Sequence, residues 1–223
     1  MALDWEEFLD PYIQTVGELK IKLRGIRKQF RKQNRYSPIE FVTGRVKSVD
    51  SIKQKMQLRG VLEENIARDI QDIAGLRIMV QFVDDIEEVL NLLRQRQDMT
   101  IVYERDYIRN MKASGYRSYH VIVEYPVDTI DGQKCVLAEI QIRTLAMNFW
   151  ATIEHSLNYK YKGEFPEEIK KRLSRTAKIA LELDEEMRKI RDDIREAQLL
   201  FDPGSRSYSD GLGNSDDTDE LYR

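Results

Sequence analysis

The sequence predicts an α+β protein in which helices at both ends of the chain enclose a mixed α/β centre. Residues 3–30 repeat apolar side chains at three- and four-residue steps, as in an amphipathic helix. Short apolar runs between residues 75 and 143 have the length of strands, and a second long helical pattern begins at Pro166. The chain shows no internal repeat. This order of elements favours one sheet with helices packed around it.

The first half of the chain contains two strands separated by a helix. Ser37-Pro38 interrupts the chain, and a helix is expected from about Lys47 to Leu58. Residues 75–82 form a continuous apolar run, which predicts a buried strand. Acids open the helix expected over residues 84–94, because the positive end of the helix dipole stabilises them. Residues 99–107 are expected to form the next strand.

The second half begins with a β-hairpin. Residues 118–125 and 134–143 are strand-like, and the connection between them contains Asp131-Gly132, a strong turn signal. Alternation along the second strand separates an apolar face from a polar one. The apolar face consists of Val136, Ala138, Ile140 and Ile142, and the opposite face displays Glu139, Gln141 and Arg143.

Helical patterns follow the hairpin. A helix is expected over residues 145–161 and a long one from Pro166, so that residues 1–200 make a single domain. Residues 203–223 are rich in Gly, Ser and Asp and predict a disordered acidic tail.

Composition excludes several classes of protein. The 223 residues are 41% hydrophobic and 34% charged with a net charge of −3, so bulk charge does not indicate a polyanion partner. The lone Cys135 excludes an internal disulfide and is expected to be a small apolar filler of its strand. Two histidines, His120 and His155, disfavour zinc sites and hydrolases built on several His and Asp ligands. The sequence has neither a signal peptide nor an apolar run of about 20 residues, which predicts a soluble cytoplasmic protein with no membrane association.

Two basic clusters are candidate anion sites. Lys20, Arg24 and Arg27 share one stripe of the first helix, which is either a solvated face or a ligand site. The second cluster follows Gly44 and lies at the start of the second helix, a natural setting for phosphates. It consists of Arg45, Lys47, Ser51 and Lys55. The alternative for this cluster is an ordinary basic surface helix.

Two acids occupy strand-like positions among apolar residues, Asp72 and Glu139. Such carboxylates are costly unless they are paired or bound to a metal, and Mg²⁺ often uses only one or two of them together with substrate phosphates. A salt bridge to Arg77 or Arg143 is the alternative for either acid.

A third cluster is the glycine-containing segment from Lys112 to His120. Tyr116 within it could stack on a purine while the cations hold phosphates, or it could be the core tyrosine of a surface loop. Each cluster alone is a weak signal. Their coexistence in one small domain favours nucleotide phosphotransfer.

Longer motifs make the sequence recognisable. The sequence resembles the small alarmone synthetases, the stand-alone (p)ppGpp synthetases of the RelA/SpoT superfamily, over roughly residues 3–200. The matching stretches are residues 37–47, 71–85, 114–120 and 139–161. The resemblance implies a nucleotidyltransferase-like mixed β-sheet of about five strands flanked by N- and C-terminal helices.

The resemblance also implies a reaction and its residues. ATP would donate its β,γ-pyrophosphate to the 3′-hydroxyl of GDP or GTP, giving ppGpp or pppGpp and AMP in the stringent response. It assigns the ATP phosphates to Arg45, Lys47, Ser51, Lys55 and Arg77. It assigns Mg²⁺ to Asp72 and Glu139, with Glu139 also drawing the hydroxyl proton. It assigns the acceptor to Lys112, Tyr116, His120 and Gln141, with Tyr116 stacked on guanine.

The subgroup that the sequence resembles most is a homotetramer whose central cleft binds the product alarmone allosterically. By this resemblance the cleft would be lined by Lys20, Arg24, Arg27, Glu40, Phe41, Thr43 and Asn148. The chain begins almost directly at the synthetase and has few histidines, so synthesis without hydrolysis is expected. Two alternatives stay open: a nucleotidyltransferase, which would release pyrophosphate rather than AMP, and a module that binds single-stranded RNA through basic stripes and tyrosines.

Overall fold

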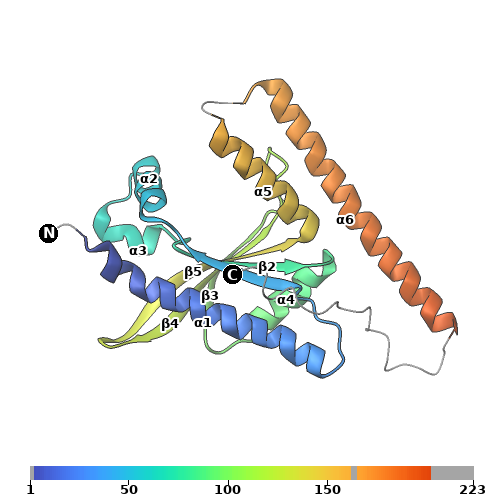
Figure 1. The fold of residues 1–223 in the computed structure, drawn as a ribbon, viewed down its shortest axis with the longest axis horizontal. Helices are drawn as coiled ribbons and strands as arrows, with labels where there is room; N and C mark the ends of the chain where they lie inside the picture. The colour runs from blue at the N-terminus through green and yellow to red at the C-terminus, as the bar shows by residue number, and fades with distance from the viewer. Residues whose placement is uncertain (1–2, 162–164, 202–223) are drawn as a thin grey trace.

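The computed structural model describes residues 3–161 and 165–201 (Figure 1). The acidic tail predicted over residues 203–223 lies outside the described residues. The helices are α1 (Trp5–Lys32), α2 (Val49–Arg59), the short 3-10 turn η1 (Glu63–Asn65), α3 (Ile66–Asp69), α4 (Asp84–Arg94), α5 (Leu145–Lys160) and α6 (Glu167–Phe201). The strands are β1 (Phe41–Val46), β2 (Ala74–Val80), β3 (Thr100–Asp106), β4 (Tyr119–Thr129) and β5 (Gly132–Thr144).

The five strands form one mixed sheet in the order β1-β2-β5-β4-β3. β2 and β5 run parallel, and the other neighbouring pairs are antiparallel. The register places Gly75 of β2 opposite Glu139 and Arg77 opposite Gln141. The α+β class with a mixed sheet of about five strands is therefore confirmed, and the parallel pair brings the polar face of β5 beside β2.

Strand β1 is the element that the sequence patterns did not predict. It lies at the edge of the sheet, and Val42 is its one fully buried side chain, so its apolar signal is weak. Because β1 extends to Val46, the second helix begins at Val49 rather than near Lys47. The side chain of Ser48 caps that helix by accepting a hydrogen bond from the Ser51 N–H.

The main core lies between the sheet and α1, with α4 packed on the same side (Figure 1). Leu19 and Leu23 of α1 are fully buried there with Ile78 and Ile140. The apolar face predicted for β5 is confirmed, since all four of its side chains are buried in this core. The opposite face of the sheet is covered only in part, by α5, and the long α6 packs against α5 (Figure 1). This leaves its polar side chains available for a site.

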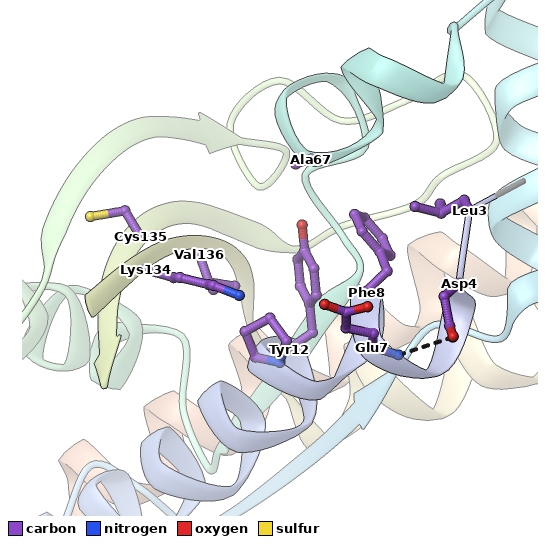
Figure 2. Close-up of a pocket in the computed structure, with 10 residues that line it drawn as sticks. Leu3, Asp4, Glu7, Phe8, Tyr12, Ala67, Lys134, Cys135 and Val136 are labelled. Atoms are coloured by element: carbon purple, nitrogen blue, oxygen red, sulfur yellow. Dashed lines mark hydrogen bonds between the residues drawn. The ribbon is translucent and has the colours of Figure 1, made fainter. Parts of the chain in front are cut away.

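Two further expectations can be compared with the structure. Cys135 lies in β5 as expected, but it is exposed, because it alternates with the buried Val136 and so lies on the face of the strand opposite the core (Figure 2). It is therefore not the buried filler that the composition suggested. Across residues 3–161 and 165–201, no helix combines the length and the apolar character needed to cross a membrane.

Candidate active site

The polar face of the sheet carries two adjoining cavities. One, of about 250 Å³, lies over β1, β2 and β5, and its lining includes Asp72, Glu139 and Thr43. The other, of about 470 Å³, extends under α5 towards the loop before β4. Both cavities share Arg45, Arg77 and Gln141 in their lining. The two cavities thus form one continuous site, large enough for more than one nucleotide moiety.

Asp72 and two lysines form the first cluster. Lys47 Nζ lies 3.1 Å from Asp72 Oδ2 and Lys55 Nζ lies 2.7 Å from Asp72 Oδ1. Burial alone raises the pKa of Asp72, but the hydrogen bond and charge of Lys55, followed by Lys47, hold it below its ordinary value. The carboxylate is therefore ionised at neutral pH. Its partners are these lysines, not the arginines considered as alternatives from sequence.

The position of Asp72 also corrects an expectation. It lies in the turn two residues before β2 rather than within the strand. The turn directs its carboxylate towards the start of α2, where Lys47, just before the helix, and Lys55, within it, each bind one of its oxygens. Ser51 and Lys55 lie four residues apart on α2, whereas Lys47 precedes the helix.

Arginines form the second cluster. Burial, then the charges of Arg143 and Arg45, lowers the pKa of Arg77. A cation whose neighbours are cations is destabilised until an anion arrives, so this cluster favours a polyanionic ligand. Lys112 lines the same cavity from the loop before β4. The arrangement suits a chain of phosphates.

Glu139 is part of a closed ring of hydrogen-bonded side chains. Arg143 donates to the hydroxyl oxygen of Tyr116 at 2.6 Å and to Gln141 Oε1 at 2.7 Å. Gln141 Nε2 donates to Glu139 Oε2 at 2.7 Å, while His120 Nδ1 lies 2.9 Å from Glu139 Oε1. Tyr116 Oη lies 2.9 Å from His120 Nε2.

The ring fixes the protons within it. Because Arg143 donates to the Tyr116 oxygen, the hydroxyl proton points to His120 Nε2, which leaves the Nδ1 proton for Glu139. Burial raises the pKa of Glu139, but the hydrogen bond of His120, then the amide of Gln141, lower it below its ordinary value. Glu139 is thus an ionised carboxylate held in one orientation, with Asp72 facing the same cavity.

The donor set of Asp72 and Glu139 fits Mg²⁺. Both groups are ionised oxygen ligands on one cavity, which is the chemistry that this ion prefers. Over residues 3–161 and 165–201, no group of three or more His, Cys, Asp or Glu side chains could hold a metal alone. Substrate phosphates and water would have to complete the coordination of an ion bound here.

The tyrosine loop, residues 112–116, closes the far end of the site. The N–H of Gly115 donates to the carbonyl of Lys112 at 2.8 Å, which makes a tight turn. Lys112 Nζ lies 4.9 Å from the centroid of the Tyr116 ring, and the guanidinium of Arg143 lies 5.2 Å from it. Tyr116 is half-buried and lines the cavity. The predicted acceptor residues Lys112, Tyr116, His120 and Gln141 are thus brought together.

The N-terminal basic stripe lies elsewhere. Arg24 donates to the carbonyl of Val42 at 3.3 Å, and Arg27 lies 3.7 Å from Glu40 Oε1. The stripe therefore runs along the β1 edge, next to Glu40, Phe41 and Thr43. Lys20 lies beside Gly44.

Asn148 lies apart from this stripe on α5, which covers the opposite face of the sheet (Figure 1). In the part of the chain that the structure describes, no donor reaches its buried Oδ1. Within one chain, the basic stripe therefore comes together with Glu40, whereas Thr43 lines the cavity on the polar face of the sheet and Asn148 lies on α5.

Comparison with known proteins places the chain in a family. Residues 44–164 match the family model described as a region found in RelA / SpoT proteins. The chain belongs to the RelA/SpoT family. It is 58% identical over 197 residues to GTP pyrophosphokinase YjbM of Bacillus subtilis, an alignment that covers 88% of this chain and 93% of that protein.

Solved structures of RelA/SpoT-type synthetases share the fold over most of the chain. A GTP pyrophosphokinase family protein from Streptococcus pneumoniae is 74% identical, with a TM-score of 0.84, covering 91% of this chain and all of that one. Small alarmone synthetase 1 from B. subtilis, bound to its product pppGpp, is 58% identical with a TM-score of 0.83, covering 85% and 97%. A structure of the same synthetase bound to AMPCPP has a TM-score of 0.77 and 54% identity, covering 86% and 99%. The RelA/SpoT membership thus extends well beyond the matched motif.

Sequence reasoning left two site residues without a role. Arg143 joins both arms of the ring around Glu139, and its alternation with Glu139 and Gln141 was the signal that could have assigned it. His155 lines the larger cavity from α5; it lies within the matching stretch of residues 139–161, but the resemblance gave it no role.

Proposed function

We propose that this protein transfers the β,γ-pyrophosphate of ATP to the 3′-hydroxyl of GDP or GTP. The observation that carries the proposal is the placement of two ionised carboxylates beside a crowded set of cations on one sheet face. The relatives named GTP pyrophosphokinase and the B. subtilis structures bound to pppGpp and AMPCPP support the choice of substrates. In this proposal residues 1–200 act as one catalytic unit.

The donor half of the site would hold the ATP phosphates. Arg45 and Arg77 line both cavities, Ser51 and Lys55 stand on α2, and Lys47 lies just before that helix. Phosphate oxygens would take over the hydrogen bonds that the two lysines now give to Asp72. Positioning and charge neutralisation of this kind supply most of the rate in phosphoryl transfer.

The acceptor half would hold guanosine against Tyr116, with Lys112 and Gln141 near its ribose and phosphates. The 3′-oxygen then attacks the β-phosphorus of ATP, the bond from that phosphorus to the α–β bridging oxygen breaks, and AMP leaves. Glu139 accepts the proton of the 3′-hydroxyl. Its two hydrogen-bonded neighbours hold the carboxylate ionised and aimed at the cavity before substrate arrives.

Asp72 and Glu139 would hold Mg²⁺. When bound, the ion would neutralise phosphate charge and increase the acidity of the 3′-hydroxyl. Glu139 therefore needs only modest basicity, in agreement with its lowered pKa.

Nucleotidyl transfer is the competing reaction on this fold. It would release pyrophosphate, whereas pyrophosphate transfer releases AMP. Incubation with labelled ATP, GDP and Mg²⁺, followed by chromatography, distinguishes the two. Guanosine tetraphosphate with stoichiometric AMP supports the proposal, and free pyrophosphate contradicts it.

The proposal includes synthesis without hydrolysis, a homotetramer, and stimulation by the product. Self-association is supported by a row of exposed apolar side chains at four-residue steps along α5. The row consists of Leu145, Phe149, Ile153, Leu157 and Tyr161. Asn148, next to this row, would join the basic stripe only through another copy of the chain.

Stimulation by the product can be tested at Lys20. If the basic stripe along α1 and β1 binds pppGpp, Lys20→Met lowers the ratio of stimulated to unstimulated rate. The exposed Lys28 of the same helix serves as control through Lys28→Met. Equal stimulation of both variants would argue against the cleft.

A further inference from the structure

The loop that carries Tyr116 is anchored to the long helix α6 by the residues on either side of the tyrosine. Gly115 and Arg117 are both buried, while Tyr116 between them is half-buried and lines the site. This alternation points the two neighbours away from the cavity and towards α6. The ring of Tyr116 itself packs against a small apolar cluster of Trp150, Ala151 and Ala177.

The first anchor is a close approach of the backbone at Gly115. A Cβ at this position would lie 2.3 Å from the Cβ of Ala177 and 3.8 Å from the Cα of Ser174 on α6. Gly115 also has φ of +94°, a conformation that favours glycine. The loop backbone therefore rests directly on the helix, with no side chain between them.

The second anchor lies two turns further along α6. Arg117 Nη1 lies 3.6 Å from Asp184 Oδ2, and both side chains are about 95% buried, with exposures of 7% and 5%. Thr144, at the junction of β5 and α5, donates to the same carboxylate at 2.9 Å. Asp184 thus joins the tyrosine loop, the end of β5 and α6 at one point.

Burial makes the Arg117–Asp184 pair costly to form. Burial, only partly offset by Thr144 and Arg117, raises the pKa of Asp184 above its ordinary value. Burial likewise lowers the pKa of Arg117 despite the nearby carboxylate. Desolvation therefore outweighs the attraction, and a costly buried pair of this type is best accounted for by the geometry it fixes.

We propose that Asp184, through Arg117, is a positioning residue that places Tyr116 for the guanine of the acceptor. Together with the Gly115–Ala177 contact, it makes α6 the support of the acceptor half of the site. The donor half rests on β1, β2 and α2 and has no part in this anchor. The inference rests on the proposed function, because Tyr116 must be the residue that meets the acceptor base.

Asp184→Asn tests the inference, because it keeps the shape and the bond from Thr144 but removes the charge that holds Arg117. We expect the KM and the Kd for GDP to rise about tenfold, as for the loss of one charged contact, with the KM for ATP changed less than about twofold. Glu186→Gln, an exposed acid on the same helix, is the matched control and should behave as the parent protein. Equal changes for both nucleotides, or an unchanged Kd for GDP, would overturn the inference.

Calorimetric titration of GDP into the AMPCPP-bound protein separates this inference from the reaction itself. A parent protein that binds GDP in this titration but forms no tetraphosphate when ATP replaces AMPCPP refutes the proposed reaction, while the GDP Kd of Asp184→Asn still decides the role of Asp184. A parent protein that does not bind GDP overturns both.

A second variant covers the case in which Asp184→Asn does not fold. Ala177→Gly removes the surface on which Gly115 rests, and the exposed Ala197 of α6 gives the control Ala197→Gly with the same loss of helix propensity. We expect only Ala177→Gly to weaken GDP binding, by about threefold or more, as for the loss of a buried methyl contact. Identical GDP affinities for the two glycine variants would contradict the inference.

Discussion

The pairing of Asp72 with Lys47 and Lys55 predicts that this carboxylate competes with ATP for the two lysines. Asp72→Asn removes the competitor without changing the size of the side chain. The contacts of 2.7 and 3.1 Å are charge-assisted hydrogen bonds, and the three side chains keep only 17–23% of their exposure. Each such bond contributes about 1.5–3 kcal/mol, most of which is recovered as hydration when the lysines are freed.

A net gain of about 1–2 kcal/mol then remains for phosphate binding, which corresponds to about 5- to 30-fold in affinity. Titration of AMPCPP in the presence of EDTA measures this gain without any contribution from metal. Asp50→Asn, in the exposed first turn of α2, is the control for the loss of one negative charge near the phosphates. If Asp72→Asn binds metal-free AMPCPP no more tightly than Asp50→Asn, the competition is refuted. In Mg²⁺ the same Asp72→Asn variant should lose turnover.

Four further predictions concern stability and the ring of hydrogen bonds that includes Glu139. Gly44→Ala should destabilise the fold by about 1–3 kcal/mol in urea unfolding, because its Cβ would lie 2.8 Å from Val16 Cγ1. Gly25→Ala, in α1 with no atom within 4 Å, should instead stabilise it by about 0.5–1 kcal/mol. Asp72 has a lowered pKa, so the stability that its ionised form gives the fold is complete above the ordinary pKa of about 4 and is lost as the pH falls through the lowered pKa. In Asp72→Asn the free energy of unfolding should therefore fall less steeply as the solution is made acidic. Tyr116→Phe keeps the ring but cuts one arm between Arg143 and Glu139, so rapid-quench assays should show kcat reduced about 3- to 10-fold with little change in the KM for GDP.

Much of the fold could be predicted because its signals are local. The apolar alternation of β5, the acids that open α4 and the stripe of α1 all correspond to elements in the structure. β1 escaped prediction because an edge strand with a central glycine and one fully buried side chain has no distinct period. Cys135 was misplaced although the alternation along β5 puts it on the face opposite Val136, which the core helices do not cover.

The sequence predicted which residues belong to the candidate site, but not which hydrogen bonds and ion pairs join them. Motif resemblance assigned Asp72 and Glu139 to one Mg²⁺ site, and the structure places both on one cavity, yet the resemblance gave no partner for either. The partners come from the register of β4 with β5, which places His120 opposite Gln141, and from the turn that aims Asp72 at α2. The contact of Arg117 with Asp184 spans 67 residues of sequence, so no local pattern could have revealed it.

The most direct test of the proposed reaction follows both products of one incubation. Protein, ATP labelled at the β-phosphate, GDP and Mg²⁺ are mixed, and nucleotides are separated by chromatography for the parent protein and for Glu139→Gln. The account predicts labelled guanosine tetraphosphate and an equal amount of AMP from the parent protein, and a loss of both from Glu139→Gln. Release of free pyrophosphate in place of AMP, or undiminished transfer by Glu139→Gln, would contradict it.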